Sequence, residues 1–373
     1  MVERMTRLVA RALGLSAPQL LEAFKPATAE HLADVVALRQ ALFGADIHWD
    51  DAAYLTWRYH FGSTVHGRGE CWVLVLDSRV AGMVGTEEIE LQRGEERIAA
   101  WSTMDIAIDQ RYEGSGLGSW MNLRLCAVAG CALTIGSNSK SRNMITRMFR
   151  RLPDRRSYVL PIRFQRMVRK RLGPWAGAHI VTPAVEALAA LWRLVALPAA
   201  GGQVELRHIT RFGSDAAELL LWASDPEEWQ VARGVDFLNW RLFGNPRISY
   251  GVVGAYLHGT LVGYLATMRR KDLTGVTSVM LVDWAVDRTR YSAVFRALCA
   301  DAIRTALHHG AELVGVTAYH ARSERLLRAM GFVPRFDSYE TIAVYATDAV
   351  RLQGLLATAP WFITEINTDR DTL

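Results

Sequence analysis

Residues 104–121, MDIAIDQRYEGSGLGSWM, join a strand-like run to a helix-like one through three glycines at every second position. The glycines are Gly114, Gly116 and Gly118, and apolar residues at helical spacing follow the last of them. The first amides of a helix have no partner within the helix, and glycines remove side chains that would keep a phosphate away from them. The stretch therefore predicts either an anion-binding loop or a flexible connector.

The spacing of these glycines excludes two common phosphate-binding motifs. A Walker A loop needs a Lys-Ser or Lys-Thr pair, and none follows here. The dinucleotide fingerprint needs G-x-G-x-x-G, whereas this stretch has G-x-G-x-G. The glycines alone do not distinguish a phosphate site from a connector. The residues around them are needed to decide between the two.

Length and composition predict a soluble protein of two domains. The chain has 373 residues, 50% of them hydrophobic, which is more than one average domain needs. The stretch nearest to a membrane span, residues 184–200, contains Glu186 and Arg193, so we expect no span. The first residues space their apolar side chains as an amphipathic helix and lack a signal-peptide core, which favours a cytoplasmic location.

Cysteine and charge usage narrow the kinds of site. None of the four cysteines lies in a C-x-x-C pair or has histidines at zinc spacing, so we expect reduced, packed thiols and no metal site. The net charge is +5, but residues 140–171 hold twelve Lys or Arg and one acid, Asp154. That segment would attract phosphates, acidic substrates or anionic lipid, and a plain solvated face explains it equally well.

The chain contains an internal repeat, which predicts two related halves. YLTWRYHFG at 54–62 is echoed by FLNWRLFGN at 237–245, and MDIAID is echoed by VDWAVD at 282–287. Each copy reads as strands alternating with helices, which predicts an α/β layer architecture. The W-R pair, Trp57 and Arg58 in the first copy, recurs in a copy without the glycines, so we assign it to packing.

These patterns divide the chain into five segments. They are an N-terminal amphipathic helix at 1–23, a first half at 24–165, a basic and apolar connector at 166–202, a second half at 203–350 and a C-terminal tail at 351–373. The connector contains three prolines and a Gly-Gly pair, which is typical of a join between domains. Its middle, PAVEALAALWRLVALP, predicts a short helix packed against a domain.

The residues around the glycines resemble the acyl-CoA-binding motif of the GNAT superfamily of N-acyltransferases. In that motif a hydrophobic strand leads into R/Q-x-x-G-x-G/A, and the matching stretch here is MDIAIDQRYEGSGLGSWM. RSERLLRAMGFVP in the second copy resembles the superfamily's later helix, so the resemblance extends over about 24–165 and 203–347. It implies an α/β fold of two tandem GNAT-like domains, each a mixed, mainly antiparallel twisted sheet flanked by helices.

The resemblance also implies where an acyl-CoA donor would bind. In the family, the pyrophosphate lies on the loop amides and the pantetheine arm pairs with the edge of the preceding strand. Carried over, the donor contacts fall on the strand, the loop and the segment after the next strand, at Ile106, Ala107, Ile108, Arg111, Glu113, Gly114, Ser115, Gly116, Leu117, Gly118, Asn138 and Asn143. Glu113 departs from the motif, which has Arg or Gln there, and we expect Arg111 to compensate. A polar helix cap explains Asn138 and Asn143 equally well.

One carboxylate is the best candidate for catalysis within this resemblance. Asp105 lies beside the expected thioester, so we predict that it prepares the acceptor amine, with a structural aspartate as the alternative. The tyrosine that the family uses as an acid is replaced by Phe149 and Leu327, neither of which can donate a proton. Three histidines before the core strands could also act as bases, although surface histidines are the simpler interpretation: His48, His60 and His66.

The second copy has no glycine in the matching loop, DRTRYSAVFRAL at 287–298, so we predict that only the first copy binds the donor. The leading hypothesis is an acyl-CoA-dependent N-acyltransferase that moves acetyl from acetyl-CoA to an amine, without a metal. The alternative is a catalytically weak binding or scaffold protein associated with cell-envelope polysaccharide synthesis or a membrane surface.

The expected partners follow from the same features. They are a small-molecule or saccharide acceptor that carries an amine, and peripheral contact with an anionic membrane through the N-terminal helix and RFQRMVRKRLGPW at 163–175. We expect no specific nucleic acid. The acceptor, the acyl chain length and the oligomeric state are left open by the sequence.

Overall fold

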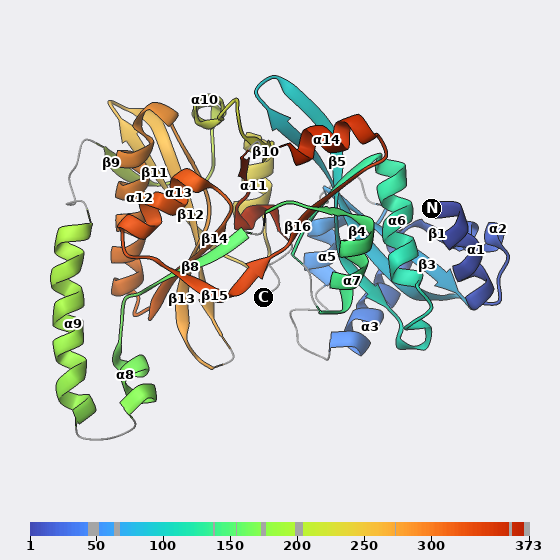
Figure 1. Ribbon diagram of the computed structural model, residues 1–373, viewed down its shortest axis with the longest axis horizontal. Coiled ribbons are helices and arrows are strands. Elements are labelled where there is room, and N and C mark those ends of the chain that lie inside the picture. Colours follow the sequence, from blue (N-terminus) through green and yellow to red (C-terminus); the bar gives the residue numbers. More distant parts are fainter. Residues whose placement is uncertain are drawn as a thin grey trace.

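The computed structural model describes residues 1–43, 52–62, 68–136, 139–153, 155–172, 177–197, 204–272, 274–357 and 360–368. Within these ranges the chain forms two mainly antiparallel sheets that lie beside each other and are flanked by helices (Figure 1). The predicted fold class, two tandem α/β halves with mixed sheets, is therefore confirmed.

The first sheet has β1 (Phe24–Pro26) at one edge. Next to it come β3 (Gly69–Leu76), β4 (Arg79–Arg93), β5 (Glu96–Ile108), β6 (Cys131–Ile135), β16 (Ile342–Ala346) and β7 (Arg150–Arg151), in that order. Three short strands pair outside this path: β2 (Tyr59–His60), β10 (Trp229–Val231) and β17 (Trp361–Phe362). The β5 and β6 strands run parallel, whereas the β3, β4 and β5 strands form an antiparallel meander.

The second sheet repeats this arrangement. Its order is β15 (Val333–Glu340), β8 (Arg155–Pro161), β14 (Leu313–Ala318), β13 (Thr277–Val286), β12 (Thr260–Lys271), β11 (Tyr250–Leu257) and β9 (Glu205–His208). The parallel pair of β13 and β14 corresponds to β5 and β6 of the first sheet.

The two halves exchange a strand. The β8 strand comes from the first half but lies between β14 and β15, and the β16 strand comes from the second half but lies beside β6. Neither predicted range, 24–165 or 203–350, therefore contains one complete sheet. Each sheet needs the other half of the chain to cover its edge, which ties the two halves together.

Helices cover both faces of the first sheet. On one face, α3 (Leu32–Phe43) and α5 (Ala52–Arg58) pack on a core around Tyr59, Val73 and Met83, next to the 3₁₀ turn η1 (Ala29–His31). On the other face lie α6 (Leu117–Ala129) and α7 (Ser139–Met148). The predicted N-terminal helix is two helices, α1 (Val2–Ala12) and α2 (Ala17–Ala23), because Ser16 caps the second with a capping box.

The second sheet is covered in the same way. The helices α12 (Tyr291–His308) and α13 (Ala321–Ala329) pack on one face, and α10 (Ser214–Ala223) and α11 (Val235–Phe243) pack on the other. A last helix, α14 (Ala349–Leu356), lies over β16 of the first sheet. All four cysteines, Cys71, Cys126, Cys131 and Cys299, are buried and free, as the sequence predicts.

The repeated W-R pair joins the two halves. The rings of Trp57 and Trp240 stack with centroids 4.8 Å apart, and Trp240 Nε1 donates to the backbone oxygen of Trp57 at 3.3 Å. The guanidinium of Arg241 lies over the Trp57 ring at 5.9 Å. The prediction that this pair serves packing is confirmed, with the addition that the two copies pack on each other.

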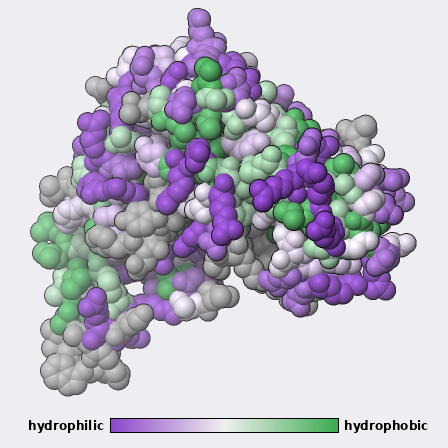
Figure 2. Space-filling model, turned by 45° about the vertical axis from the view of Figure 1, so that its right-hand side comes forward, coloured by the Kyte–Doolittle hydropathy of each residue, from purple (hydrophilic) through white to green (hydrophobic). Residues whose placement is uncertain are grey.

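The connector does not pack as the sequence suggests. It forms α8 (Gln165–Leu172) and a long helix, α9 (Gly177–Ala196), on which Leu188 and Leu191 are 70% and 61% exposed. The α9 helix stands at the edge of the molecule, and hydrophobic side chains face outward along it (Figures 1 and 2). No helix in the described part of the chain is both long enough and apolar enough to cross a membrane.

Candidate active site

The glycine stretch forms a strand, a tight turn and a helix. After β5, the 3₁₀ turn η2 (Gln110–Tyr112) leads through Gly114 and Gly116 into α6, and both glycines have the left-handed φ values of 83° and 81° that favour glycine. Ser115 Oγ donates to the backbone oxygen of Tyr112 at 2.7 Å and accepts from the amide of Leu117 at 3.2 Å, which fixes the turn. The space beside Gly114 is open to 4 Å, so an anion can approach the loop there.

A bulge immediately before this loop changes the course of β5. Two residues, Asp105 and Ile106, stand opposite Val84 of β4, and Asp105 has a φ of 52°. On its other edge, β5 pairs with β6 only at Trp101 and Ser102. The edge of β5 from 105 to 108 therefore has no partner from β6, and the predicted contacts of Ile106, Ala107 and Ile108 fall on this edge. We call the region between this edge and β6 the first cleft.

Asp105 lies in a buried ion cluster. Its Oδ1 is 3.4 Å from Arg39 Nη1, and its Oδ2 accepts a hydrogen bond from Tyr59 at 2.5 Å. Burial opposes ionisation of Asp105, but Arg39, the Tyr59 hydroxyl and Arg58 outweigh it and hold the pKa of this carboxyl below its usual value. Burial and the adjacent carboxylate raise the pKa of Tyr59 well above its usual value, so Tyr59 keeps its proton. An ionised carboxyl with both oxygens engaged is a weak base.

Charges on the loop are arranged differently from the sequence expectation. Arg111 forks onto the carboxylate of Asp109, with Nη2 to Oδ2 at 2.8 Å, instead of being available to offset Glu113. Glu113 and Gly114 are both exposed on the loop. The first helical amides, rather than a cation of the loop, are therefore the donors that an anion would meet.

The remaining predicted site residues are two asparagines and three histidines. Asn143 is exposed on α7, and Asn138 lies outside the described residues. Of the three histidines, His60 is half-buried on β2, whereas His48 and His66 lie outside the described residues.

Strand exchange brings a tyrosine to the helix that lacks one. Phe149, at the position of the family tyrosine, is buried, and its ring centroid is 6.0 Å from that of Tyr345 on β16. Burial raises the pKa of Tyr345 above its usual value, so the phenol keeps its proton at neutral pH. Sequence reasoning missed Tyr345 because it belongs to the other copy.

Between the halves, a cavity of about 600 Å³ opens beside the point where β5 and β6 separate. Its charged lining is mainly acidic: Glu87, Glu88, Glu90 and Asp236, with Arg68 as the one cation among the described residues. A much smaller cavity, of about 10 Å³, shares Glu87 and Phe237 with it and reaches Ser102 and Leu133, the last pair of the β5 and β6 ladder. We call these two cavities together the acidic cavity. A cationic group held in it would lie close to the first cleft.

The matching region of the second half is filled by the protein itself. Its β13 strand also has a bulge, where Val282 is the extra residue, and the next residue, Asp283, is fully buried. The tail of the chain runs past this point: Ile363 bridges to Tyr319, and Thr364 Oγ1 donates to Asp283 Oδ1 at 2.7 Å. Arg155 Nη1 donates to the backbone oxygen of Thr364 at 2.9 Å, which holds the tail in place.

Aromatic and polar side chains complete this filling. Tyr291 begins α12 at the position where the first half has its glycine turn. Its hydroxyl accepts a hydrogen bond from Trp284 Nε1 at 3.0 Å and shares another with Ser323 Oγ at 2.6 Å. A serine, a histidine and a glutamate lie here in the order of a nucleophilic triad. Ser323 Oγ is 2.5 Å from His320 Nδ1, and His320 Nε2 is 3.3 Å from Glu228 Oε2. Because Ser323 is completely buried and shared with Tyr291, this series has no access for a substrate.

No cluster of three or more side chains suited to a metal ion occurs in the part of the chain that the structure describes. Neither a scan against models of known families nor a comparison with curated proteins finds a match for the sequence.

Comparison with solved structures does find matches to the fold. A GCN5-related N-acetyltransferase from Anabaena variabilis ATCC 29413 is 10% identical with a TM-score of 0.59, over 86% of this chain and 71% of that one. N-myristoyltransferase from Saccharomyces cerevisiae, with bound myristoyl-CoA, is 12% identical with a TM-score of 0.56. The match covers 87% of this chain and 79% of that one. A tandem GNAT protein from the clavulanic acid biosynthesis pathway is 13% identical with a TM-score of 0.51. The match covers 86% of this chain and 97% of that one. The chain therefore has the tandem fold of the GNAT N-acyltransferases.

Proposed function

We propose that this protein is an acyl-CoA-dependent N-acyltransferase whose first half binds the acyl donor. The observation that carries the proposal is the difference between the halves: an unpaired β5 edge and a glycine turn in the first, and a filled region in the second. In this proposal the pyrophosphate of the donor lies on the amides of residues 113–118, and the pantetheine follows the backbone of residues 106–108. Solved neighbours that are N-acetyl- and N-myristoyltransferases support the same reaction class.

The acidic cavity supports an acceptor with an amine. Four carboxylates line it, of which Glu87 and Glu90 are paired with Arg58 and Arg97 at 3.4 and 3.1 Å. Glu88 and Asp236 add further negative charge, so a protonated amine would be attracted there. Glu87 is the carboxylate common to both parts of the cavity, and its Oε2 lies 3.4 Å from Arg58 Nη2. We propose Glu87, rather than Asp105, as the group that receives the proton from the acceptor.

The reaction then needs three proton movements, the first of which is the loss of a proton from the bound ammonium group to solvent. The free amine nitrogen attacks the thioester carbonyl carbon, the new C–N bond forms, and the C–S bond breaks to release a thiolate. The proton lost by the amine goes to Glu87, and the thiolate takes a proton from Tyr345 or from solvent. Asp105 positions the β5 bulge through Arg39 and Tyr59 and stays ionised throughout.

Acetyl is the acyl group that we propose for transfer, because N-acetyltransferases are among the solved neighbours. The neighbour with bound myristoyl-CoA makes a long chain the competing choice. Titration of the full chain with acetyl-, octanoyl- and myristoyl-CoA tests this, and tighter binding with each added methylene would favour the long chain.

The test of the proposed function is release of free coenzyme A thiol by the full chain with acetyl-CoA and a panel of diamines and amino sugars. We expect turnover with cationic acceptors and a loss of turnover in Glu87→Gln. Binding of acetyl-CoA without turnover on any amine would contradict the proposal, as would turnover that survives Glu87→Gln.

The second candidate is a protein that binds acyl-CoA without transferring it. The engaged Asp105 and the exposed Glu113 in the donor loop favour it, because both depart from what an efficient transferase needs. In that case acyl-CoA raises the melting temperature of the protein, but no acceptor is consumed.

A further inference from the structure

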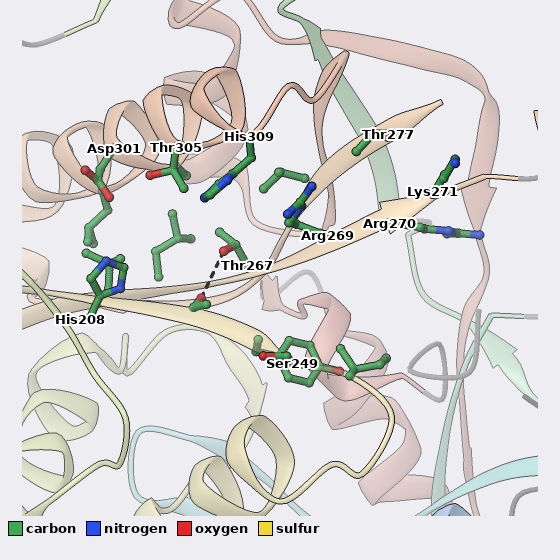
Figure 3. A pocket seen from close by; sticks show the side chains of 18 of the residues that line it. His208, Ser249, Thr267, Arg269, Arg270, Lys271, Thr277, Asp301, Thr305 and His309 are labelled. Carbon is green, nitrogen blue, oxygen red and sulfur yellow. Dashed lines mark hydrogen bonds between the residues drawn. The ribbon is translucent and has the colours of Figure 1, made fainter. Parts of the chain in front are cut away.

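A separate cavity of about 720 Å³ lies in the second half, away from the glycine loop. Its floor is the α12 face of β11, β12 and β13, and one wall is α12 itself (Figure 3). Val253, Leu265 and Val279 line the floor. The volume is in the range of pockets that hold small organic ligands. Nothing in the proposed acyl transfer uses this cavity.

The charged lining of this cavity is strongly cationic. Four side chains carry a fixed positive charge, Arg247, Arg269, Arg270 and Lys271, whereas Asp301 is the one acid among the described lining residues. Arg269, Arg270 and Lys271 form no ion pair with any residue that the structure describes. Uncompensated positive charge around a concave surface attracts an anion.

Other surface arginines nearby are neutralised by neighbours. Arg207 pairs with Glu205 at 2.5 Å, and Arg290 pairs with Asp287 at 2.9 Å. Arg166 of α8 pairs with Glu312 at 3.3 Å. Arg269, Arg270 and Lys271 differ in this from Arg166, Arg207 and Arg290.

Polar groups in the cavity are placed to receive an oxyanion. Arg269 comes from β12 and His309 from the end of α12, and both line the cavity together with Thr267 and Thr305 (Figure 3). Gly251 leaves the floor without a side chain, and its carbonyl accepts from Thr267 Oγ1 at 3.2 Å. The Arg269 guanidinium, the His309 imidazole and the Thr305 hydroxyl are donors that suit the several acceptor oxygens of a phosphate group, whereas the Thr267 proton is already donated to Gly251.

We propose that this cavity binds an organic phosphate. The phosphate lies between Arg269 and His309, with Arg270 and Lys271 at the rim, and the uncharged body of the ligand lies on the apolar floor. The phosphate belongs either to a soluble ester or to a lipid headgroup.

The lipid source is included because α8 borders the rim of the cavity. A Cβ added at Gly275 would lie 3.8 Å from Lys271 Cε and 3.9 Å from the guanidinium of Arg166. The exposed apolar residues of α9 follow α8 directly in the chain.

Calorimetric titration of the full chain with inorganic pyrophosphate tests the soluble source. Arg269→Gln is expected to lower the affinity on the order of tenfold, since one charge-assisted hydrogen bond is lost. Arg207→Gln is the matched control, because it removes the same charge from the same half outside the cavity and should leave the affinity unchanged. Co-sedimentation with phosphatidylcholine vesicles, with and without phosphatidylglycerol, tests the lipid source with the same two variants.

Either probe supports the proposal if its binding falls in Arg269→Gln and not in Arg207→Gln. Because pyrophosphate could also bind the donor loop, the titration is repeated in Gly114→Val. Binding that is lost in Gly114→Val but kept in Arg269→Gln would place the anion in the first cleft and overturn the proposal. Absence of binding to both probes overturns it as well.

Discussion

The two halves share a bulged strand with an aspartate at the bulge, but they differ in what lies beyond it. In the first half β5 leaves β6 after Ser102, and a left-handed Gly116 starts the helix. In the second half Tyr291 starts the helix without a glycine turn, and the tail at Ile363 and Thr364 lies along the separated strands. One fold is thus used once with an accessible strand edge and once with that edge covered.

The aspartates beside the two bulges, Asp105 and Asp283, have similar partners in both halves. Asp105 pairs with Arg39 and Tyr59, while Asp283 pairs with Arg233, Tyr264 and Thr364. The same type of cluster, carboxylate with arginine and tyrosine, thus stabilises the bulge in a half where the tail covers the separated strands. This is an argument for a positioning role of Asp105 and against its role as the base.

The largest effect that we predict comes from removing these carboxylates. Asp283→Ala leaves Arg233 buried without a counter-ion, so the free energy of unfolding should fall by about 3–5 kcal/mol. Asp105→Ala should cause a smaller loss, because Asp105 has one partner fewer. Urea denaturation measures both, with the exposed Glu218→Ala as the control that should change little.

Full stability with a complete loss of turnover in Asp105→Ala would contradict the positioning role, since Asp105 would then act chemically. A pH series gives a second readout. The pKa of Asp105 is lower in the folded state than in the unfolded state, so its stabilisation is fully present above its ordinary pKa of about 4 and is lost as the pH falls through the lowered value. The stability difference between the natural protein and Asp105→Asn should therefore shrink only in acid.

Much of the fold could be predicted from local patterns. The repeat, the W-R pair and the strand, turn and helix around Gly116 are set by neighbouring residues and by the need for left-handed φ at glycine. The exchange of β8 and β16 could not be predicted, because either strand would fit the edge of either sheet by its own alternation. Only the complete packing of both halves selects the pairing.

The candidate site divides in the same way. The glycine loop is local and was recognisable, whereas the partners of Asp105 come from α3 and β2, far away in the sequence. The exposed face of α9 was also misjudged, because an apolar helix in a connector reads as a packed one when its surroundings are unknown. Long-range contacts decide both questions.

Tyr345 is the proposed proton donor of the first half. If its phenol protonates the leaving thiolate, Tyr345→Phe should lower kcat about a hundredfold with little change in the KM for acetyl-CoA. Tyr256→Phe on the surface of the second half is the control and should leave kcat unchanged. Unaltered kcat in Tyr345→Phe would assign the proton to solvent.

The donor loop is tested by a pair of matched glycines. Gly114 and Gly310 both have positive φ, 83° and 74°, and both have open space where a side chain would go. Valine at either position should cost about 1–2 kcal/mol of stability. Affinity for acetyl-CoA, measured by calorimetry, should fall about tenfold only in Gly114→Val, because only that side chain covers the loop amides. An equal loss in Gly310→Val would show that the second half contributes to donor binding.

The smallest predicted effect concerns the contact that joins the halves. Trp57 and Trp240 stack at 4.8 Å, so a double-mutant cycle with Trp57→Leu and Trp240→Leu should give a coupling energy of about 1 kcal/mol. Because the acidic cavity lies between the halves, the same variants should raise the KM for the acceptor and leave acetyl-CoA binding unchanged. Stacking at the interface would then set how the second half, in which the tail covers the separated strands, shapes the acceptor side of the first.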